Sequence, residues 1–244
     1  MRPDFFGTTG HKITSQELDQ IDIGGAKKHY KPISLSDKFA FHAVSLLRKL
    51  PDFYFRDNHP LRACMLETIA AVPGMVGAML RHMRSLRTLK QDTGWIMHLL
   101  HEAENERLHL MIWVKYVQPS MLHRLLILAA QGGFLSAFSV LYMVSPRTAH
   151  RFAGYLEEEA IHSYTLFLEA IENGEIENTK ADSMAIEYYN MTPKATLRDV
   201  VVAVRSDEAV HRDCNHFLSD RIRLGDEDLQ KVTKEALENR GTAK

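Results

Sequence analysis

The sequence predicts an all-α protein, a bundle of four long helices with two additional helices packed against it. Three observations predict this class. Apolar residues recur at helical spacing over most of the chain. A Glu-x-x-His pattern, in which both side chains point to one face of a helix, occurs in two distant segments. A stretch from Leu125 to Val144 carries no charged residue.

The two Glu-x-x-His segments each place a carboxylate inside an apolar stripe. Glu106 and His109 form one pair, and Glu208 and His211 form the other. With 13 His in the chain, roughly one such pattern is expected by chance, so the spacing alone indicates little. Both glutamates, however, stand where the helical period requires a core residue. A carboxylate in a core needs a partner or a metal ion.

Two further glutamates complete a metal-binding set. Glu67 is the only acidic residue of a helix predicted at 60–89, and Glu157 is the one member of Glu157-Glu158-Glu159 on the seam of its helix. Two Glu-x-x-His helices and two single-Glu helices are the arrangement of di-iron carboxylate proteins. The sequence therefore predicts a ferritin-like four-helix bundle with a di-iron carboxylate core. Zinc is disfavoured by the excess of Glu and the lack of Cys.

The other ionisable residues near these motifs are not expected to bind the metal. Glu102 and His98 stand at the edge of the stripe of Glu106, and His101 and Glu104 lie off it. We interpret all four as solvated or as lying behind the ligands. A third pair, Glu159-x-x-His162, is off the seam of its own helix and is interpreted in the same way.

Six long helical segments are expected. Pro73-Gly74 should kink the second, and Asn173-Gly174 should end the fifth. The first is equally consistent with a helix packed in the core and one lying in a membrane interface. The predicted ranges are 36–50, 60–89, 92–117, 125–144, 146–173 and 196–225, with one short helix in a polar connection at 175–194.

Length and composition bound the organisation of the 244 residues. We expect an extended N-terminal arm (1–35), a single di-iron helical-bundle domain (36–225) and a charged C-terminal tail (226–244). Lys+Arg 30 against Asp+Glu 31 gives a net charge of -1, which argues against nucleic acid as a partner. The two cysteines have no metal-ligand or disulfide spacing, which indicates a reducing compartment. Residues 1–30 lack the features of a signal or transit peptide.

The uncharged stretch from Leu125 to Val144 is long enough to cross a bilayer, at about 30 Å as a helix. It stands between the two halves of the metal set, so crossing would put those halves on opposite sides of the membrane. We therefore expect it to lie flat, with one side on the bundle and the other in one leaflet. The alternative is a buried crossover helix of a soluble protein.

Four segments together resemble the motifs of the alternative oxidases. The resemblance runs from about residue 36 to 223 and includes Pro73-Gly74-Met75-Val76-Gly77 and Ser145-Pro146-Arg147. The four motifs are Leu66-Glu67-Thr68, Asn105-Glu106-Arg107-Leu108-His109-Leu110, Leu156-Glu157-Glu158-Glu159-Ala160 and Arg205-Ser206-Asp207-Glu208-Ala209-Val210-His211.

This resemblance implies a cyanide-insensitive quinol oxidase, bound to one leaflet and dimeric, that oxidises ubiquinol and reduces O2 to water without pumping protons. It implies two iron ions and a redox-active Tyr164, which lies two helical turns from Glu157 on the same face. Asn105, His150 and Asp207 would order the ligands. The implied ligands are Glu67, Glu106, His109, Glu157, Glu208 and His211. The implied quinol pocket includes Arg48, Asp52, Arg62, Leu66, Glu159 and Ser163.

The chain departs from the family pattern at three positions. Ser163 stands where Thr is common, His162 where an aliphatic residue is common, and Tyr189 where Trp is expected. A regulatory cysteine arm of the plant type is missing. The short N-terminus resembles that of a bacterial member, which places the protein on the cytoplasmic face of the inner membrane. The matrix face of the mitochondrial inner membrane is the alternative.

Two other functions fit parts of the pattern. A di-iron quinone hydroxylase shares the six ligands and also binds at the membrane interface. The Leu-Glu-Thr and Leu-Glu-Glu-Glu-Ala motifs favour the oxidase. A ferritin-like protein of iron storage or peroxide defence belongs to a different class. The apolar stretch at 125–144 argues against it, because such proteins are soluble.

Overall fold

The computed structural model describes residues 11–25 and 29–231, and this part of the chain is built of helices without a β-strand. The predicted fold class is confirmed. The helices are α1 (Ser15–Asp19), α2 (Leu35–Leu47), α3 (Lys49–Phe55), α4 (His59–Ala70), α5 (Val72–Thr88), α6 (Trp95–Trp113), α7 (Met121–Val144), α8 (Pro146–Glu172), α9 (Ser183–Tyr188) and α10 (Leu197–Leu224).

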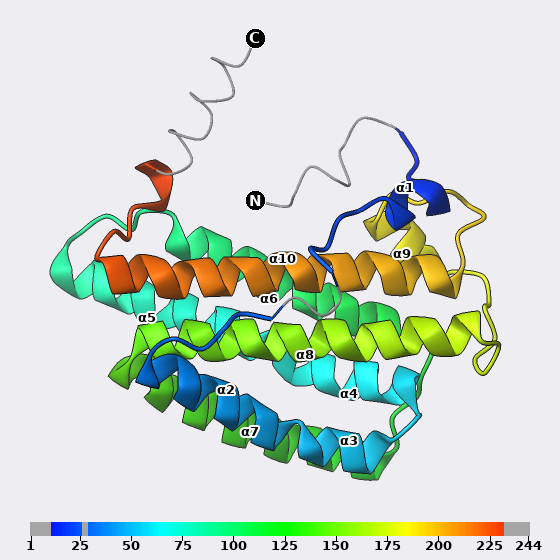
Figure 1. The fold of residues 1–244 in the computed structure, drawn as a ribbon, viewed down its shortest axis with the longest axis horizontal. Coiled ribbons are helices and arrows are strands. Elements are labelled where there is room, and N and C mark those ends of the chain that lie inside the picture. The colour runs from blue at the N-terminus through cyan, green and yellow to red at the C-terminus, as the bar shows by residue number, and fades with distance from the viewer. Residues whose placement is uncertain (1–10, 26–28, 232–244) are drawn as a thin grey trace.

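The bundle consists of α8, α10, α6 and the consecutive pair α4–α5. Figure 1 shows α8 and α10 side by side along the length of the molecule, with α6 and the α4–α5 pair behind them. Both α4 and α5 pack against α6, and α4 also packs against α8. These are the segments in which the four glutamates were expected. The fold therefore brings one glutamate to the interior from each of the four rods, a rod being α6, α8, α10 or the α4–α5 pair.

Local signals in the sequence set the ends of the helices. Ser34 and Asp37 form a capping box at the start of α2, and Thr196 and Asp199 form the predicted one at the start of α10. Gly225 ends α10 with φ 68°, a conformation that favours glycine. The polar groups at these helix ends are thereby satisfied within the chain.

The kink expected at Pro73-Gly74 is a break between two helices. α4 ends at Ala70 and α5 begins at Val72, so Pro73 falls in the first turn, where its missing N–H costs nothing. A Cβ atom on Gly74 would lie 2.6 Å from the carbonyl oxygen of Leu99. Glycine therefore permits the close approach of α5 to α6.

Two parts of the N-terminal region differ from the prediction. The first helix is divided into α2 and α3 at Arg48 and continues to Phe55. The expected extended arm contains the short helix α1, which has a capping box of Thr14 and Glu17. Its extended part includes Ile13, which pairs with Met191 in an isolated bridge. The rest of the arm (1–10 and 26–28) and most of the expected tail (232–244) lie outside the described residues.

Helices α2, α3 and α7 cover one side of the bundle, along the lower edge of Figure 1. Among the described residues, two helical stretches are long and apolar enough to cross a membrane, but they differ in burial. The most apolar window of His59–Thr88 is 56% buried, whereas that of Met121–Val144 is 11% buried. The exposed apolar side chains on this side include Leu35, Phe39, Leu46, Leu50, Phe53, Leu122, Leu125, Leu128, Leu135 and Val140.

Candidate metal centre

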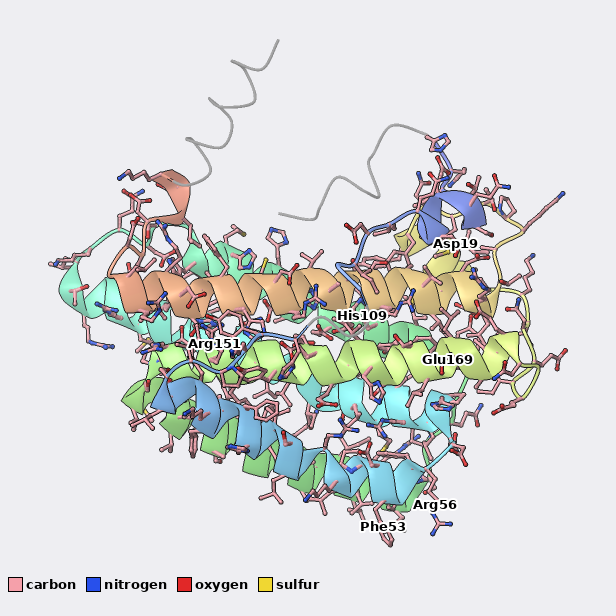
Figure 2. All side chains as sticks on the ribbon, in the orientation of Figure 1. Asp19, Phe53, Arg56, His109, Arg151 and Glu169 are labelled. Atoms are coloured by element: carbon pink, nitrogen blue, oxygen red, sulfur yellow. The ribbon has the colours of Figure 1, made fainter. Side chains whose placement is uncertain are left out.

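Six buried side chains from the four rods of the bundle meet in its middle. Glu67 comes from α4, Glu157 from α8, the Glu106–His109 pair from α6 and the Glu208–His211 pair from α10. Each is at most 6% exposed. Figure 2 shows His109 about midway along the bundle. The helical spacing read from the sequence therefore converges in space on one polar site inside an apolar core.

The six side chains form two groups that share two members. Ligand atoms of Glu67, Glu106, His109 and Glu208 lie within 4.8 Å of one another, and so do those of Glu106, Glu157, Glu208 and His211. Glu106 and Glu208 belong to both groups. The arrangement thus offers two adjacent cation positions with two bridging carboxylates and one histidine at each.

The candidate ligand atoms lie close together but are not aligned to hydrogen-bond with one another, as expected of atoms that bind metal ions. Several buried oxygen and nitrogen atoms of the site have no aligned hydrogen-bond partner in residues 11–25 and 29–231. His211 Nδ1 lies 2.6 Å from Glu106 Oε1, and His109 Nδ1 lies 3.1 Å from Glu208 Oε1, without hydrogen-bond alignment. Buried polar atoms are otherwise nearly always satisfied, so these converging lone pairs fit the binding of cations. The unpartnered atoms are Glu67 Oε2, Glu106 Oε1 and Oε2, His109 Nδ1, Glu208 Oε1 and His211 Nδ1.

Without cations, the charges of this site cannot all be present together. Burial and the neighbouring carboxylates raise the pKa of Glu67 and of Glu157 well above the usual value. Burial also opposes the charge of Glu106, but the nearby imidazoles of His211 and His109 hold its pKa well below the usual value. Protons on Glu67 and Glu157 therefore supply the positive charge that metal ions would bring.

Asp207 fixes the orientation of the His109 ring from the side opposite the metal site. His109 Nε2 lies 3.1 Å from Asp207 Oδ2, which leaves Nδ1 facing the metal site. The same oxygen accepts hydrogen bonds from Asn105 Nδ2 at 3.0 Å and from the hydroxyl of Tyr189 at 3.0 Å. Tyr189, one of the departures from the family pattern, thus supplies a donor to this carboxylate.

His150 lies one residue further from the site than the resemblance implied. Its Nδ1 is 3.0 Å from Asn215 Oδ1, and Asn215 in turn donates to the backbone carbonyl of His211 at 3.1 Å. Asn215 is a contact that sequence reasoning missed. Its position one turn after His211 on α10 was the available signal.

Tyr164 touches the metal site directly. Its hydroxyl donates to Glu67 Oε1 and accepts a hydrogen bond from Trp113 Nε1 at 2.7 Å. Tyr164 is 4% exposed and stacks on Trp113, with ring centroids 5.8 Å apart. Tyr164 lies two helical turns after Glu157, but its side chain is long enough for the hydroxyl to reach Glu67 on α4.

A cavity of about 1000 Å³ leads from the side covered by α2, α3 and α7 to the metal site. Apolar side chains dominate its walls, including the exposed Leu50 and Phe53. In Figure 2, Phe53 points outward from α3, away from the bundle. At its inner end the lining includes Tyr164 and the carboxylates Glu67, Glu106, Glu157 and Glu208.

The residues expected in the quinol pocket gather at this cavity. Arg48, Arg62, Leu66, Glu159 and Ser163 line it. Arg48 pairs with Glu159 at 2.7 Å. Asp52 bridges Arg48 at 3.0 Å and Arg62 at 2.6 Å.

The ionisable residues that the sequence analysis did not expect to bind the metal differ in their exposure. His101, Glu104 and His162 are exposed. Glu102 is 6% exposed and bonds to Asn215 behind His211, which agrees with a place behind the ligands, while His98 is half-buried. An apolar stripe defines the centre of a buried face well and its margin poorly.

Comparison with known proteins gives the family. The sequence profile of the alternative oxidases matches residues 14–220. The chain is 50% identical over 238 residues to a mitochondrial ubiquinol oxidase of Batrachochytrium dendrobatidis, covering 97% of this chain and 74% of that protein. It is 57% identical over 200 residues to alternative oxidase 3, mitochondrial, of Glycine max, covering 82% of this chain and 61% of that protein. A mitochondrial ubiquinol oxidase of Mangifera indica is 56% identical over 194 residues, covering 80% of this chain and 61% of its own length. The chain thus spans about three-fifths of the two plant relatives. Together with the buried four-glutamate, two-histidine site, these matches show that the chain belongs to the alternative oxidase family.

Proposed function

We propose that the protein is a ubiquinol oxidase that reduces O2 to water at a two-iron centre without pumping protons. One observation carries the proposal: an apolar cavity opens beside exposed apolar helices and ends at the four buried carboxylates. Oxygen ligands with imidazole suit iron in both its common oxidation states. Iron bound there would supply the binding and reduction of O2.

The chain's own residues bind the quinol and hold protons. An apolar tail fits the walls of the cavity, and the Arg48–Asp52–Arg62 group gives hydrogen-bond donors to the polar head. Tyr164 and Glu67 both line the cavity, and the hydroxyl proton of Tyr164 is already hydrogen-bonded to an oxygen of this ligand. We assign Tyr164 the role of donating one electron and that proton during turnover.

The same arrangement supports attachment to one membrane leaflet. The exposed apolar side chains of α2, α3 and α7 lie on the side where the cavity opens, so a lipid-soluble quinol reaches the site from the bilayer. Membrane fractionation of the expressed protein tests this, because a monotopic protein resists salt extraction and is released by detergent. The relatives are named mitochondrial, which supports the matrix face over the cytoplasmic face of a bacterial inner membrane.

A homodimer is the expected assembly, and α5 offers a surface for it. Met75, Met79, Met83 and Leu86 are each more than half exposed and recur on one face of that helix. Exposed apolar side chains of α6, Met97 and Leu100, add to the area. Size determination in detergent tests this, with Met79→Glu expected to give monomers.

Oxygen consumption tests the activity. We expect the purified protein to oxidise two ubiquinols for each O2 consumed, with cyanide present or absent. Formation of a hydroxylated quinone would support the quinone hydroxylase instead. Accumulation of ferric iron without steady quinol oxidation would support iron storage.

A further inference from the structure

Trp113 connects Tyr164 of the metal site with a second tyrosine, Tyr116. The indole stacks on the ring of Tyr164 with centroids 5.8 Å apart and an interplanar angle of 26°, and its Nε1 donates to the Tyr164 hydroxyl at 2.7 Å. The centroid of the Tyr116 ring lies 5.8 Å from the same indole, with an interplanar angle of 49°. Both separations are those of aromatic rings in contact. Tyrosine and tryptophan are the aromatic side chains that lose one electron most readily, so the three rings form a row of oxidisable groups.

This row of rings leads away from the cavity proposed for the quinol. Tyr164 lines that cavity, whereas Trp113 and Tyr116 are not among the described residues that line it. Trp113 is fully buried at the last position of α6, and Tyr116 is half-buried in the turn that follows the helix. The row therefore runs from the metal site, through the core, to a ring that is partly accessible to water.

Hydrogen bonds hold both ends of the row in place. At the inner end, the Tyr164 hydroxyl donates to Glu67 Oε1 while it accepts from Trp113. At the outer end, the backbone N–H of Tyr116 donates to the backbone carbonyl of Trp113 at 3.0 Å. The Tyr116 hydroxyl accepts from the backbone N–H of Asp182, the N-cap residue of α9, at 3.0 Å. The distances between the three rings are thus fixed by the fold.

The third ring beside Trp113 does not continue the row. Phe167 lies with its centroid 5.5 Å from that of the indole. Its ring has no hydroxyl and resists the loss of an electron far more than a phenol or an indole does. Among the ring contacts of the described residues, Tyr116 is therefore the group through which an electron can reach Trp113 from the surface.

We propose that Trp113 and Tyr116 form an escape path that carries a radical from Tyr164 to the surface and so protects the metal site when ubiquinol is scarce. This rests on the proposed function, in which O2 takes four electrons, each ubiquinol supplies two, and Tyr164 donates one during turnover. When the next ubiquinol does not arrive, Tyr164 is left as a phenoxyl radical beside Glu67. The path moves this radical to Tyr116, where a water-soluble enediol reductant such as ascorbate can remove it.

Electrons and protons balance at each step of the path. The Tyr164 radical takes one electron from Trp113 and one proton along its hydrogen bond with Glu67, which restores the phenol. The oxidised indole of Trp113 keeps its N–H and takes one electron from Tyr116, whose phenol proton passes to water. The Tyr116 radical then takes one hydrogen atom from ascorbate, so an O–H bond of the reductant breaks and the phenol O–H bond forms.

Spin trapping locates the radical without any quinol. The iron-loaded protein is reduced with dithionite, separated from it and mixed with O2 and the spin trap tert-nitrosobutane, and the adduct is mapped by mass spectrometry. We expect the adduct on Tyr116 in the wild type and its loss in Trp113→Phe, which keeps Tyr116 in place. Trp95→Phe is the matched control and should keep the adduct. Trp95 is the other tryptophan of the chain, equally buried and on the same helix, but its ring contacts are His150 and Arg81.

The position of the adduct separates the path from simple exposure and from a second route. Tyr54 is 49% exposed, so a radical that spreads by exposure alone would be trapped there. The ring of Tyr188 lies 4.8 Å from that of the buried Tyr189, and this pair is the competing route to the surface. An adduct confined to Tyr54 or Tyr188, or no adduct in the wild type, overturns the inference. A Tyr116 adduct that persists in iron-loaded Trp113→Phe overturns it as well.

The lifetime of the enzyme gives the second readout. With ubiquinol in excess, Tyr116→Phe should turn over at the initial rate of the wild type. With ubiquinol limiting and O2 in excess, it should complete severalfold fewer turnovers before inactivation, and ascorbate should extend the lifetime of the wild type but not of the variant. Equal lifetimes of the two proteins, with and without ascorbate, would contradict the inference. A wild type that does not oxidise ubiquinol defeats the proposed function, and the spin trapping, which needs no quinol, then still decides whether the path exists.

Discussion

Tyr164 has two hydrogen bonds that fix the direction of its proton. Trp113 Nε1 donates to the phenol oxygen, so the phenol O–H is directed at Glu67. Burial and the carboxylate of Glu67 raise the pKa of Tyr164 well above its usual value, and the ring stays protonated. Tyr164→Phe removes this proton and keeps the ring volume. We expect normal folding and iron content with ubiquinol turnover reduced by about a hundredfold.

Tyr116→Phe is the matched control for Tyr164→Phe. The hydroxyl of Tyr116 accepts a hydrogen bond from the backbone N–H of Asp182 at the end of the bundle, so turnover should stay normal. Near-normal turnover of Tyr164→Phe would leave Tyr164 as a packing residue.

Single residues were predictable where a helical period fixes them and less so elsewhere. Glu106 and Glu208 could be placed because their pairs fall at the centre of an apolar stripe. Tyr189 could not, because it follows α9 in an irregular connection whose path depends on tertiary contacts.

At the scale of elements, the long helices follow from apolar periodicity and capping residues. The division of the first helix at Arg48 was not predictable in the same way, since Pro51 falls in the first turn of α3 and no cap marks the junction. α7 is the clearest case in which composition indicated environment: it is uncharged from Leu125 to Val144 and largely exposed in this chain.

The exposed face of α7 should determine membrane binding. Leu128 is 68% and Leu135 is 45% exposed. Burying a leucine in an apolar phase is worth about 1.5–3 kcal/mol, so changing both to Glu should weaken membrane binding by about a hundredfold or more. We expect Leu128→Glu/Leu135→Glu to remain in the soluble fraction with normal iron content. Leu224→Glu, at the exposed end of α10, is the control and should pellet with membranes. A double variant that still pellets would contradict attachment through α7.

At the scale of the whole molecule, the metal centre joins the four rods of the bundle. Removal of iron should destabilise the fold by about 3–5 kcal/mol, because buried charges would lose their partners. Glu67, Glu157, His109 and His211 all have raised pKa values in the metal-free protein. The folded state then holds more protons than the unfolded state, so stability should fall as pH rises above about 5. Urea unfolding of the chelated protein at pH 6 and pH 8 measures this, and equal stability at the two pH values would contradict the account.

Iron content in two variants of adjacent glutamates tests the central claim most directly. Glu157 is in the metal site, whereas Glu159 lies at the cavity beside Arg48. We predict two irons per chain and cyanide-insensitive ubiquinol oxidation in the wild type. Glu157→Ala should lose both the iron and the activity, and Glu159→Ala should keep the iron with weakened use of ubiquinol. Retention of iron and activity in Glu157→Ala, or loss of iron in Glu159→Ala alone, would contradict the proposed centre.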